Sequence, residues 1–307
     1  MRKNRKKTAV ALTSPAYSHL LRCPICASSM QLRDGRSLVC SSKHSFDLSK
    51  HGYVHFLSRP MRTKYEKPLF EARKKVMDSG FFAPVLSHIA ERITASWQAR
   101  AMPLRLLDAG CGEGSHLSVL QQQLSRVSDA AVLASGLDIS KDAIALAAKN
   151  NGEAFWCVAD LAHSPFADRS FDFIVNILSP SNYAEFQRLL AGTGNVIKVF
   201  PGPDYLKELR SLLYSSTDSS HSMSLERNVY DNLATIARFS EYFEVLGSQR
   251  LHYSFLLQQP LIEPFIAMTP LSWGMKESLV QQIKQRHTLE VTVDLTVIIG
   301  GRKAAVY

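Results

Sequence analysis

The stretch that most constrains this 307-residue chain is "LRLLDAGCGEG", in which a short apolar run ends at Asp108 and closely spaced glycines follow. The run favours a buried strand, and Gly110, Gly112 and Gly114 allow the backbone to turn sharply and approach a ligand before a helix begins. This order of elements is typical of nucleotide-binding α/β sheets. The third glycine comes early for the pattern GxGxxG, which weakens a dinucleotide interpretation.

Strands and helices alternate from this turn as far as residue 200. Apolar runs at 131–140, 153–160, 170–178 and 194–200 are separated by helical patterns at 115–125, 141–150 and 183–190. The alternation predicts an α/β fold with a mostly parallel, doubly wound sheet. The β-branched run "EVTVDLTVIIGG" is expected to complete the sheet at an antiparallel position. Residues 203–285 are predicted to be largely helical and irregular.

Four soft metal ligands lie near the start of the chain. Two residues separate Cys23 from Cys26, and three separate Cys40 from His44. Each pair can point at one tetrahedral ion from a tight turn, so we predict a Cys3His zinc site. Four protein ligands leave no open position for a catalytic water, and the metal is therefore expected to be structural. A redox CxxC pair and coincidence are the alternatives.

Charge and hydropathy limit the partners and the location. The chain has 36 basic and 27 acidic residues, and its net charge of +9 favours a polyanionic partner. No apolar run approaches the roughly 18 to 20 residues of a spanning helix, and no secretory segment is evident. We therefore expect a cytoplasmic protein without a membrane partner. The five cysteines, an odd number, argue against a disulfide framework.

We divide the chain near residue 60. Residues 1–60 are predicted to form a basic tail and the zinc-binding module, which is too short for a core of its own. Residues 61–307 are predicted to form a helical linker and the α/β domain. Two helices are expected after "LSRP", with "SGFF" as the break between them and Gly80 in the left-handed geometry of a helix end.

The stretch "DAGCGEG" resembles motif I of the class I S-adenosylmethionine-dependent methyltransferases, which have a Rossmann-like sheet. The next strand ends in "GLDIS", where Asp138 is placed to accept hydrogen bonds from both ribose hydroxyls of the cofactor. In that family an acidic residue at the end of the following strand lies next to the adenine, and Asp160 occupies this place. The alternative for Asp160 is a helix cap or turn residue.

A longer series of motifs narrows the resemblance. The cysteine and histidine segment is followed by "SFDLSKHGYVHFL", "FEARKKVMDSGFFAPV", "LDAGCGEG" and "PGPDYLKELR". This order closely resembles the RlmA-type 23S ribosomal RNA guanine-N(1)-methyltransferases over nearly the whole chain. The resemblance implies zinc held by Cys23, Cys26, Cys40 and His44 in a module that helps to recognise RNA.

The same resemblance implies cofactor contacts inside and outside the glycine-rich turn. Gly112 and Glu113 lie in the turn, and Phe82 and Tyr205 lie outside it. Relatives can have tyrosine at the first of these aromatic positions and histidine at the second. Core packing is the alternative for Phe82. The complete set of predicted cofactor-binding residues is Phe82, Asp108, Gly110, Gly112, Glu113, Asp138, Asp160 and Tyr205.

The resulting hypothesis is an enzyme that methylates N(1) of a guanine in a hairpin loop of 23S ribosomal RNA. The residues do not identify the general base, and no catalytic residue is assigned. Two alternatives stay open, namely a catalytically inactive zinc-ribbon scaffold that binds RNA, and a methyltransferase acting on a small molecule. Whether two chains combine as a homodimer to hold one RNA is also left open.

Overall fold

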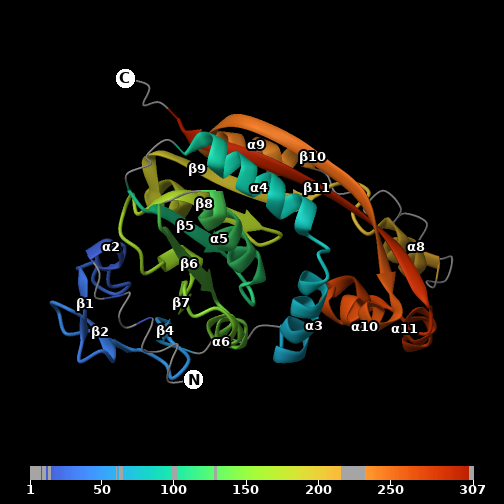
Figure 1. Cartoon of the computed structure of the whole chain (residues 1–307), viewed down its shortest axis with the longest axis horizontal. Helices are drawn as coiled ribbons and strands as arrows, with labels where there is room; N and C mark the ends of the chain where they lie inside the picture. The colour runs from blue at the N-terminus through green and yellow to red at the C-terminus, as the bar shows by residue number, and fades with distance from the viewer. Residues whose placement is uncertain are drawn as a thin grey trace.

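The computed structural model describes residues 8, 12, 15–59, 61, 65–97, 102–127, 130–215 and 232–303. The described residues form an eight-stranded sheet in the order β10-β11-β9-β8-β5-β6-β7-β4 (Figure 1). The bounds of its strands are β4 Tyr53–His55, β5 Leu104–Ala109, β6 Val132–Asp138, β7 Phe155–Val158, β8 Phe171–Ile177, β9 Leu190–Pro201, β10 Phe243–Gln258 and β11 Thr288–Arg302. The predicted basic tail at residues 1–7 lies outside the described residues.

The polarity of the sheet agrees with the prediction. Strands β4 to β9 pair in parallel, so their carboxyl ends meet at one edge. Strand β11 pairs antiparallel with β9 and with β10, which confirms the position expected for the last strand. The chain runs from β5 outward to β6 and β7 and then returns to β8 on the other side of β5. Ligand crevices form where the strand order reverses in this way.

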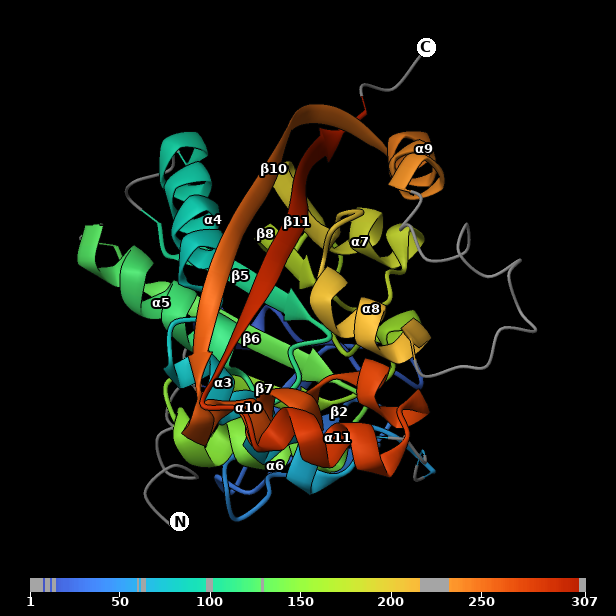
Figure 2. The ribbon, with the colours of Figure 1, turned by 90° about the vertical axis from the view of Figure 1, so that its right-hand side faces the viewer.

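Helices cover both faces of the sheet. Neighbouring residues of a strand point to opposite faces, and in β5 both Leu106 and Leu107 are buried, each in a different apolar cluster. Figure 2 shows α4 and α5 on one side of the sheet and α7 and α9 on the other. The bounds of the helices are α2 Pro15–Ser18, α3 Lys67–Asp78, α4 Ala83–Ser96, α5 Ser115–Val127, α6 Lys141–Asn150, α7 Tyr183–Leu189, α8 Lys207–Ser215, α9 Asn232–Tyr242, α10 Gln259–Met268 and α11 Glu277–Lys284.

The two helices expected after residue 60 are present as α3 and α4. Gly80 lies between them with φ of 85°, in the left-handed region as predicted. Prolines near the start of each helix remove backbone donors that would have no partner inside the helix. Helix α3 packs against α10, so the connection between the N-terminal segment and the sheet also contacts the C-terminal half of the chain.

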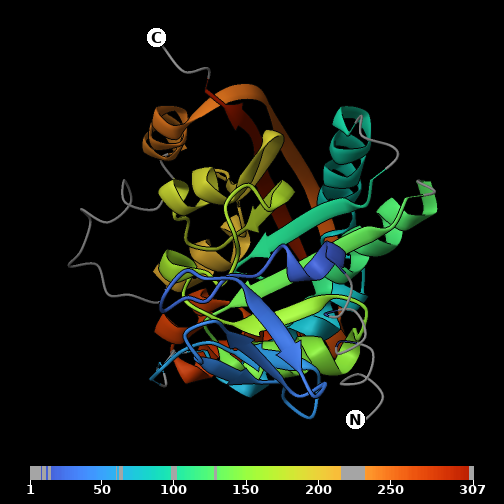
Figure 3. The ribbon, with the colours of Figure 1, turned by 90° about the vertical axis from the view of Figure 1, so that its left-hand side faces the viewer.

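The N-terminal segment folds into a small antiparallel sheet of β1 Met30–Arg33, β2 Ser37–Cys40 and β3 Ser45–Asp47. Asp34 and Gly35 connect β1 to β2, and both have positive φ, as a two-residue hairpin turn requires. Figure 3 views the molecule from the side of this segment, which lies against the large sheet. Its strand β4 pairs with β7, so the two predicted units share one sheet.

The prediction for residues 203–285 is wrong in one part, because β10 is a 16-residue strand that pairs along its length with β11. Leu251, Tyr253 and Phe255 do alternate with the polar residues His252 and Ser254 at the period of a strand. Most of β10 is half-buried or exposed, and its polar character hides this alternation. The strand is stabilised by its partner β11, whose proximity no local pattern reveals.

Gly136 in β6 lies against the indole ring of Trp156. A Cβ atom there would come within 2.3 Å of the ring and 3.0 Å of Cys111 Sγ. The ring is held in place, because its N–H donates a 2.7 Å hydrogen bond to the carbonyl of Asn151. We expect Gly136→Ala to lower the free energy of unfolding by about 1–3 kcal/mol in urea denaturation.

Gly192→Ala is the matched control for this prediction. Its added Cβ would meet nothing within 4 Å, and its free energy of unfolding should change by less than about 0.5 kcal/mol. Equal losses in the two variants would show that the contact with the indole ring is not the cause.

A cysteine and histidine cluster and a cavity at the carboxyl edge of the sheet

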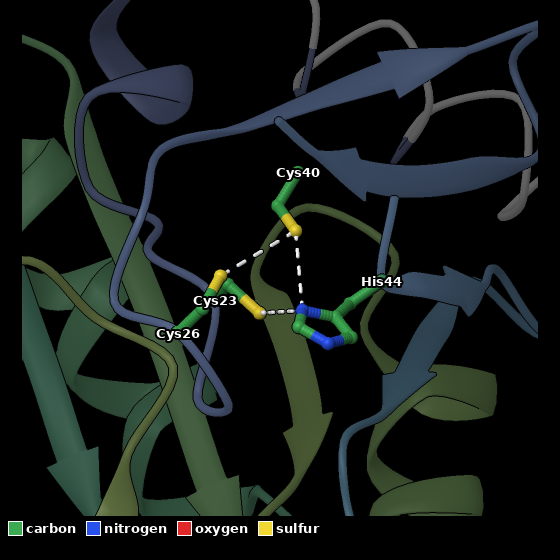
Figure 4. Close-up of side chains that lie close together, drawn as sticks. All are labelled: Cys23, Cys26, Cys40 and His44. Carbon is green, nitrogen blue, oxygen red and sulfur yellow. Dashed lines mark hydrogen bonds between the residues drawn. The ribbon is translucent and has the colours of Figure 1, made fainter. Parts of the chain in front are cut away.

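The four predicted metal ligands converge on one point, as Figure 4 shows. One donor atom from each of Cys23, Cys26, Cys40 and His44 lies within 4.8 Å of all the others. Cys26 Sγ is 3.6 Å from Cys40 Sγ, and His44 Nδ1 is 3.4 Å from Cys40 Sγ and 3.5 Å from Cys23 Sγ. Zinc bonds of about 2.3 Å to sulfur and 2.0–2.1 Å to nitrogen give tetrahedral edges of about 3.5–3.8 Å. The donor set therefore fits a tetrahedral zinc ion.

Two tight turns hold the ligands. The backbone N–H of Ala27 donates to the carbonyl of Cys23, and that of Lys43 donates to the carbonyl of Cys40. Both donors have positive φ, so each turn folds back within a few residues. The hydroxyl of Ser28 lies 3.1 Å from Cys26 Sγ, and hydrogen bonds from the Ser28 side chain and backbone and from Ser42 lower the pKa of Cys26 to about 5. The thiolate, which is the form that binds zinc, is favoured as a result.

A cavity of about 940 Å³ opens at the carboxyl edge of the parallel strands. Its wall is formed by the glycine-rich turn, the ends of β6, β8 and β9, the turn after β7, helix α3 and the segment 268–273. The volume lies in the range of cofactor and ligand sites. Six of the eight predicted cofactor-binding residues line it: Phe82, Gly110, Gly112, Asp138, Asp160 and Tyr205.

The carboxylate of Asp138 organises the glycine-rich turn. Its Oδ2 accepts a 2.9 Å hydrogen bond from the backbone N–H of Gly112, and its Oδ1 accepts one of 2.8 Å from Ser140. Burial raises the pKa of Asp138, and these hydrogen bonds oppose the effect. Gly110 approaches the opposite wall so closely that a Cβ atom there would lie 1.9 Å from Ser179 Oγ. Only glycine leaves this part of the cavity open.

The other two predicted residues, Asp108 and Glu113, are buried behind the wall and do not line it. Glu113 forms an ion pair with Arg73 of α3, with 3.3 Å between Nε and Oε2. Burial raises the pKa of Asp108 to about 8, although the nearby Arg73 lowers it. Arg73 also lines the cavity beside Gly112. It belongs to the stretch "FEARKKVMDSGFFAPV", but sequence analysis did not assign it to the site.

Phe82 and Asp160 each make a contact within the protein besides lining the cavity. Phe82 is 3% exposed and contacts Phe81 and His116 edge-on, so it has a core contact as well as a place on the wall. The Asp160 side chain accepts a hydrogen bond from the backbone of Ala162 and caps the short 3-10 helix η1 Leu161–His163. The capping alternative is therefore observed, together with a position on the cavity wall.

A buried lysine that sequence analysis missed lies at the ends of β8 and β9. Lys198 is 7% exposed, and its Nζ donates 2.6 Å hydrogen bonds to Asn176 Oδ1 and to the carbonyl of Ser179. Asn176 is held in turn by its side-chain N–H groups, which donate to the carbonyls of Ala109 and Pro180. Burial lowers the pKa of Lys198 to about 8. A lysine within the apolar run "GNVIKVF" was the available signal.

Two half-exposed aromatic residues stand at the mouth of the cavity. Tyr65 precedes α3, and Trp273 lies in the 3-10 helix η4 Pro270–Gly274. Their ring centroids are 5.6 Å apart at an interplanar angle of 48°, and 44% and 50% of their surfaces are exposed. Large exposed aromatics beside a cavity are suited to stacking on a flat ligand. Within the described ranges, no helix is long and apolar enough to span a membrane.

Comparisons with known proteins agree with both sites. Residues 21–67 match the family model of the RlmA N-terminal zinc ribbon, and residues 106–199 match that of a methyltransferase domain. YxjB of Bacillus subtilis strain 168, which is provisionally named a 23S rRNA (guanine-N(1)-)-methyltransferase, is 43% identical over 92% of this chain and 96% of its own length. The 23S rRNA (guanine(748)-N(1))-methyltransferase of Streptomyces fradiae is 31% identical over 90% of this chain and 94% of its own.

These matches extend over both the zinc ribbon and the sheet, and the chain spans nearly the whole length of each relative. The predicted class I methyltransferase fold with a zinc-binding module is thereby confirmed. This chain belongs to the family of RlmA-type 23S rRNA (guanine-N(1)-)-methyltransferases.

Proposed function

We propose that this protein transfers a methyl group from S-adenosylmethionine to N(1) of a guanine in a hairpin loop of 23S ribosomal RNA. The observation that carries the proposal is the cavity at the switch point of the sheet, where six residues expected from methyltransferase motifs converge. Two relatives that match over nearly the whole chain carry the names of enzymes with this activity. A cytoplasmic location is part of the proposal.

The strand order orients the cofactor in this proposal. Asp138 ends β6 and Asp160 follows β7, so the adenosine would lie on that side of β5, with the ribose hydroxyls donating to Asp138. Gly110 and Gly112 would let the cofactor approach the turn, and Phe82 and Tyr205 would contact it. The bound cofactor supplies an electrophilic methyl group on a sulfonium. The protein contributes mainly by aligning this group with the acceptor.

The other half of the cavity would take the acceptor base. The ends of β8 and β9 and the segment 268–273 line this half, together with Tyr65. N(1) of guanine is paired within a duplex, so the base must leave the stack or come from a loop. Single-stranded bases stack on aromatic side chains, and Tyr65 and Trp273 are placed at the entrance for this purpose.

The zinc ribbon supplies charge that suits RNA. Residues 15–59 contain six arginines and lysines but only two acidic residues. Arg33, Arg36, Lys43 and Lys50 of this group are exposed. Phosphate contacts from such side chains position a nucleic acid without reading its sequence. We therefore assign the ribbon to RNA binding. A small-molecule acceptor would not account for these exposed basic side chains.

The decisive experiment is transfer of radiolabelled methyl from S-adenosylmethionine to protein-free 23S rRNA and to assembled subunits, followed by mass spectrometry of the nucleosides. Label in 1-methylguanosine supports the proposal. Cofactor binding without label in either RNA would overturn the acceptor, and absence of cofactor binding would favour an inactive scaffold. Sedimentation with and without RNA measures whether two chains combine as a homodimer to hold one RNA.

Trp273→Ala is expected to weaken RNA methylation at the level of RNA binding. Loss of one stacked base costs about 1–3 kcal/mol, which corresponds to a rise in the KM for RNA of roughly 5- to 150-fold. The Kd for S-adenosylmethionine should stay within about threefold of the wild-type value, because Trp273 lies at the mouth on the acceptor side. Steady-state kinetics with varied RNA and calorimetric titration of the cofactor test this.

Val127→Ala serves as the comparison for Trp273→Ala. Val127 is an apolar residue that is 63% exposed at the end of α5, and it does not line the cavity. The KM of the Val127→Ala variant for RNA should equal that of the wild type. A Trp273→Ala variant with an unchanged KM for RNA would remove this residue from the acceptor site.

A further inference from the structure

Lys198 is a buried cation held by neutral groups. Its two hydrogen-bond acceptors are the Asn176 side-chain carbonyl and the Ser179 backbone carbonyl. In the described part of the chain no carboxylate forms an ion pair with it. A buried ammonium without a counter-ion carries a large desolvation cost. Such costs are concentrated at functional sites, where the charge interacts with a ligand.

One hydrogen-bond donor of Lys198 remains for a ligand. An ammonium group has three N–H donors, and the described residues accept two of them. Lys198 lines the cavity, so a ligand bound there can accept the third hydrogen bond. The two short hydrogen bonds hold Nζ in place, and a charge held in advance is the arrangement that favours electrostatic catalysis.

Lys198 and the proposed adenosine site lie on opposite sides of β5 in the sheet. Lys198 lies on β9, and its partner Asn176 lies on β8. Asp138 and Asp160 stand on the opposite side of β5, at the ends of β6 and β7. A flat base that enters past Trp273 would therefore come to the half of the cavity that contains Lys198.

Methylation at N(1) of guanine requires negative charge on the base. The N(1) proton must leave before or during attack, and the resulting charge is shared between N(1) and O6. We propose, on the basis of the function proposed above, that Lys198 Nζ donates a hydrogen bond to O6 of the acceptor guanine and stabilises this charge. Lys198 is thereby assigned as a catalytic residue that acts on the acceptor base.

The step balances without a further reagent. A water molecule accepts the N(1) proton and passes it to solvent. The electron pair on N(1) forms the bond to the methyl carbon, and the pair of the carbon–sulfur bond stays on sulfur, which becomes a neutral thioether. Lys198 keeps its own proton throughout, because its role is to hold the charge on O6 and not to transfer a proton.

The test compares Lys198→Met with the wild type, using the full-length protein and the RNA in which 1-methylguanosine has been identified. We expect kcat/KM for RNA to fall by about 10²- to 10³-fold, as for loss of one preorganised donor. The Kd for S-adenosylmethionine should change by less than about threefold. A parallel loss of cofactor affinity would assign Lys198 to the cofactor and overturn the proposal. Lys303→Met, at an exposed position after β11, is the matched control.

Two further measurements separate catalysis from a purely structural role. The ratio of wild-type to Lys198→Met kcat/KM should be greatest below pH 8 and decline above it, since the pKa of Lys198 is about 8 and the ammonium loses its charge there. RNA with 6-thioguanosine at the target should slow the wild type more than the variant, because sulfur is the weaker acceptor. A pH-independent ratio together with equal thio effects would contradict contact with O6.

The failure of this inference differs from failure of the proposed function. If the wild-type protein makes no 1-methylguanosine in any RNA, the acceptor assignment fails and the role of Lys198 on guanine fails with it. If the wild type is active and Lys198→Met is equally active, only the role of Lys198 fails. Thermal unfolding of each variant shows whether a loss of activity comes from loss of the fold, and Lys198→Arg, which keeps the charge, should recover part of the rate.

Discussion

Replacement of Cys40 with serine should remove the metal and lower methylation of 23S rRNA by at least about 100-fold, while binding of S-adenosylmethionine persists. The sheet of β1, β2 and β3 consists of strands of three or four residues. A segment of this size is held together by its metal, whose binding contributes about 10–16 kcal/mol in small zinc peptides. Without the fourth ligand the ribbon loses its fixed shape, and its exposed basic side chains lose their fixed positions relative to one another.

Cofactor binding should survive because no residue of the ribbon, 15–59, lines the cavity. Metal content by mass spectrometry, calorimetric titration of S-adenosylmethionine and methyl transfer to RNA are measured on the same preparations. Cys157→Ser is the matched control, because Cys157 is fully buried in β7 and is not among the predicted ligands. It should keep its metal. Full RNA methylation by metal-free Cys40→Ser would refute a role of the ribbon in RNA recognition.

The variant Asp138→Ala should lose cofactor binding and, with it, all measurable methyl transfer. The carboxylate holds the turn through Gly112 and is proposed to accept hydrogen bonds from both ribose hydroxyls. Each charge-assisted hydrogen bond contributes about 1.5–3 kcal/mol, so the Kd for S-adenosylmethionine should rise by roughly 10²- to 10⁴-fold. Calorimetric titration of the cofactor measures the change directly, without RNA.

Asp142→Ala removes the same charge from an exposed position in the first turn of α6 and should leave the Kd unchanged. In the wild type, affinity should weaken as pH falls, because the ribose hydroxyls donate to the carboxylate and protonation removes an acceptor. Burial raises the pKa of Asp138, so this loss should begin at a higher pH than for an ordinary aspartate. Tight binding by Asp138→Ala would exclude the ribose assignment.

Patterns confined to short stretches were sufficient for much of this molecule. The spacing of Cys23, Cys26, Cys40 and His44 predicted a cluster that the structure contains. The glycine-rich turn and the strand that ends at Asp138 predicted one wall of the cavity. Each of these features depends on a turn, or on the end of a parallel strand, and both leave a local signature in residue type and spacing.

Other features could not be read from local patterns. Asp108 and Glu113 belong to the predicted turn but are buried behind the wall, because the path of the backbone decides which side chains reach a cavity. The sequence of β10 resembles that of an irregular polar segment, and the strand is recognised only from its pairing with β11. Whether Phe82 and Asp160 contact the cofactor stays a prediction, since each also has a packing or capping role.

Features that local patterns predict differ from those that only the fold reveals in the range over which the underlying interactions act. Ligand spacing, hydrophobic period and glycine geometry act over a few residues, so the chain alone indicated the α/β class, the zinc cluster and the nucleotide-type turn. The half of the cavity that is proposed to take the acceptor base combines Tyr65, Lys198 and Trp273, which come from segments far apart in the chain. They meet only because the strand order places β9 beside β8 and the segment after α10 above them. A role for the buried Lys198 or the exposed Trp273 can be inferred only from this proximity.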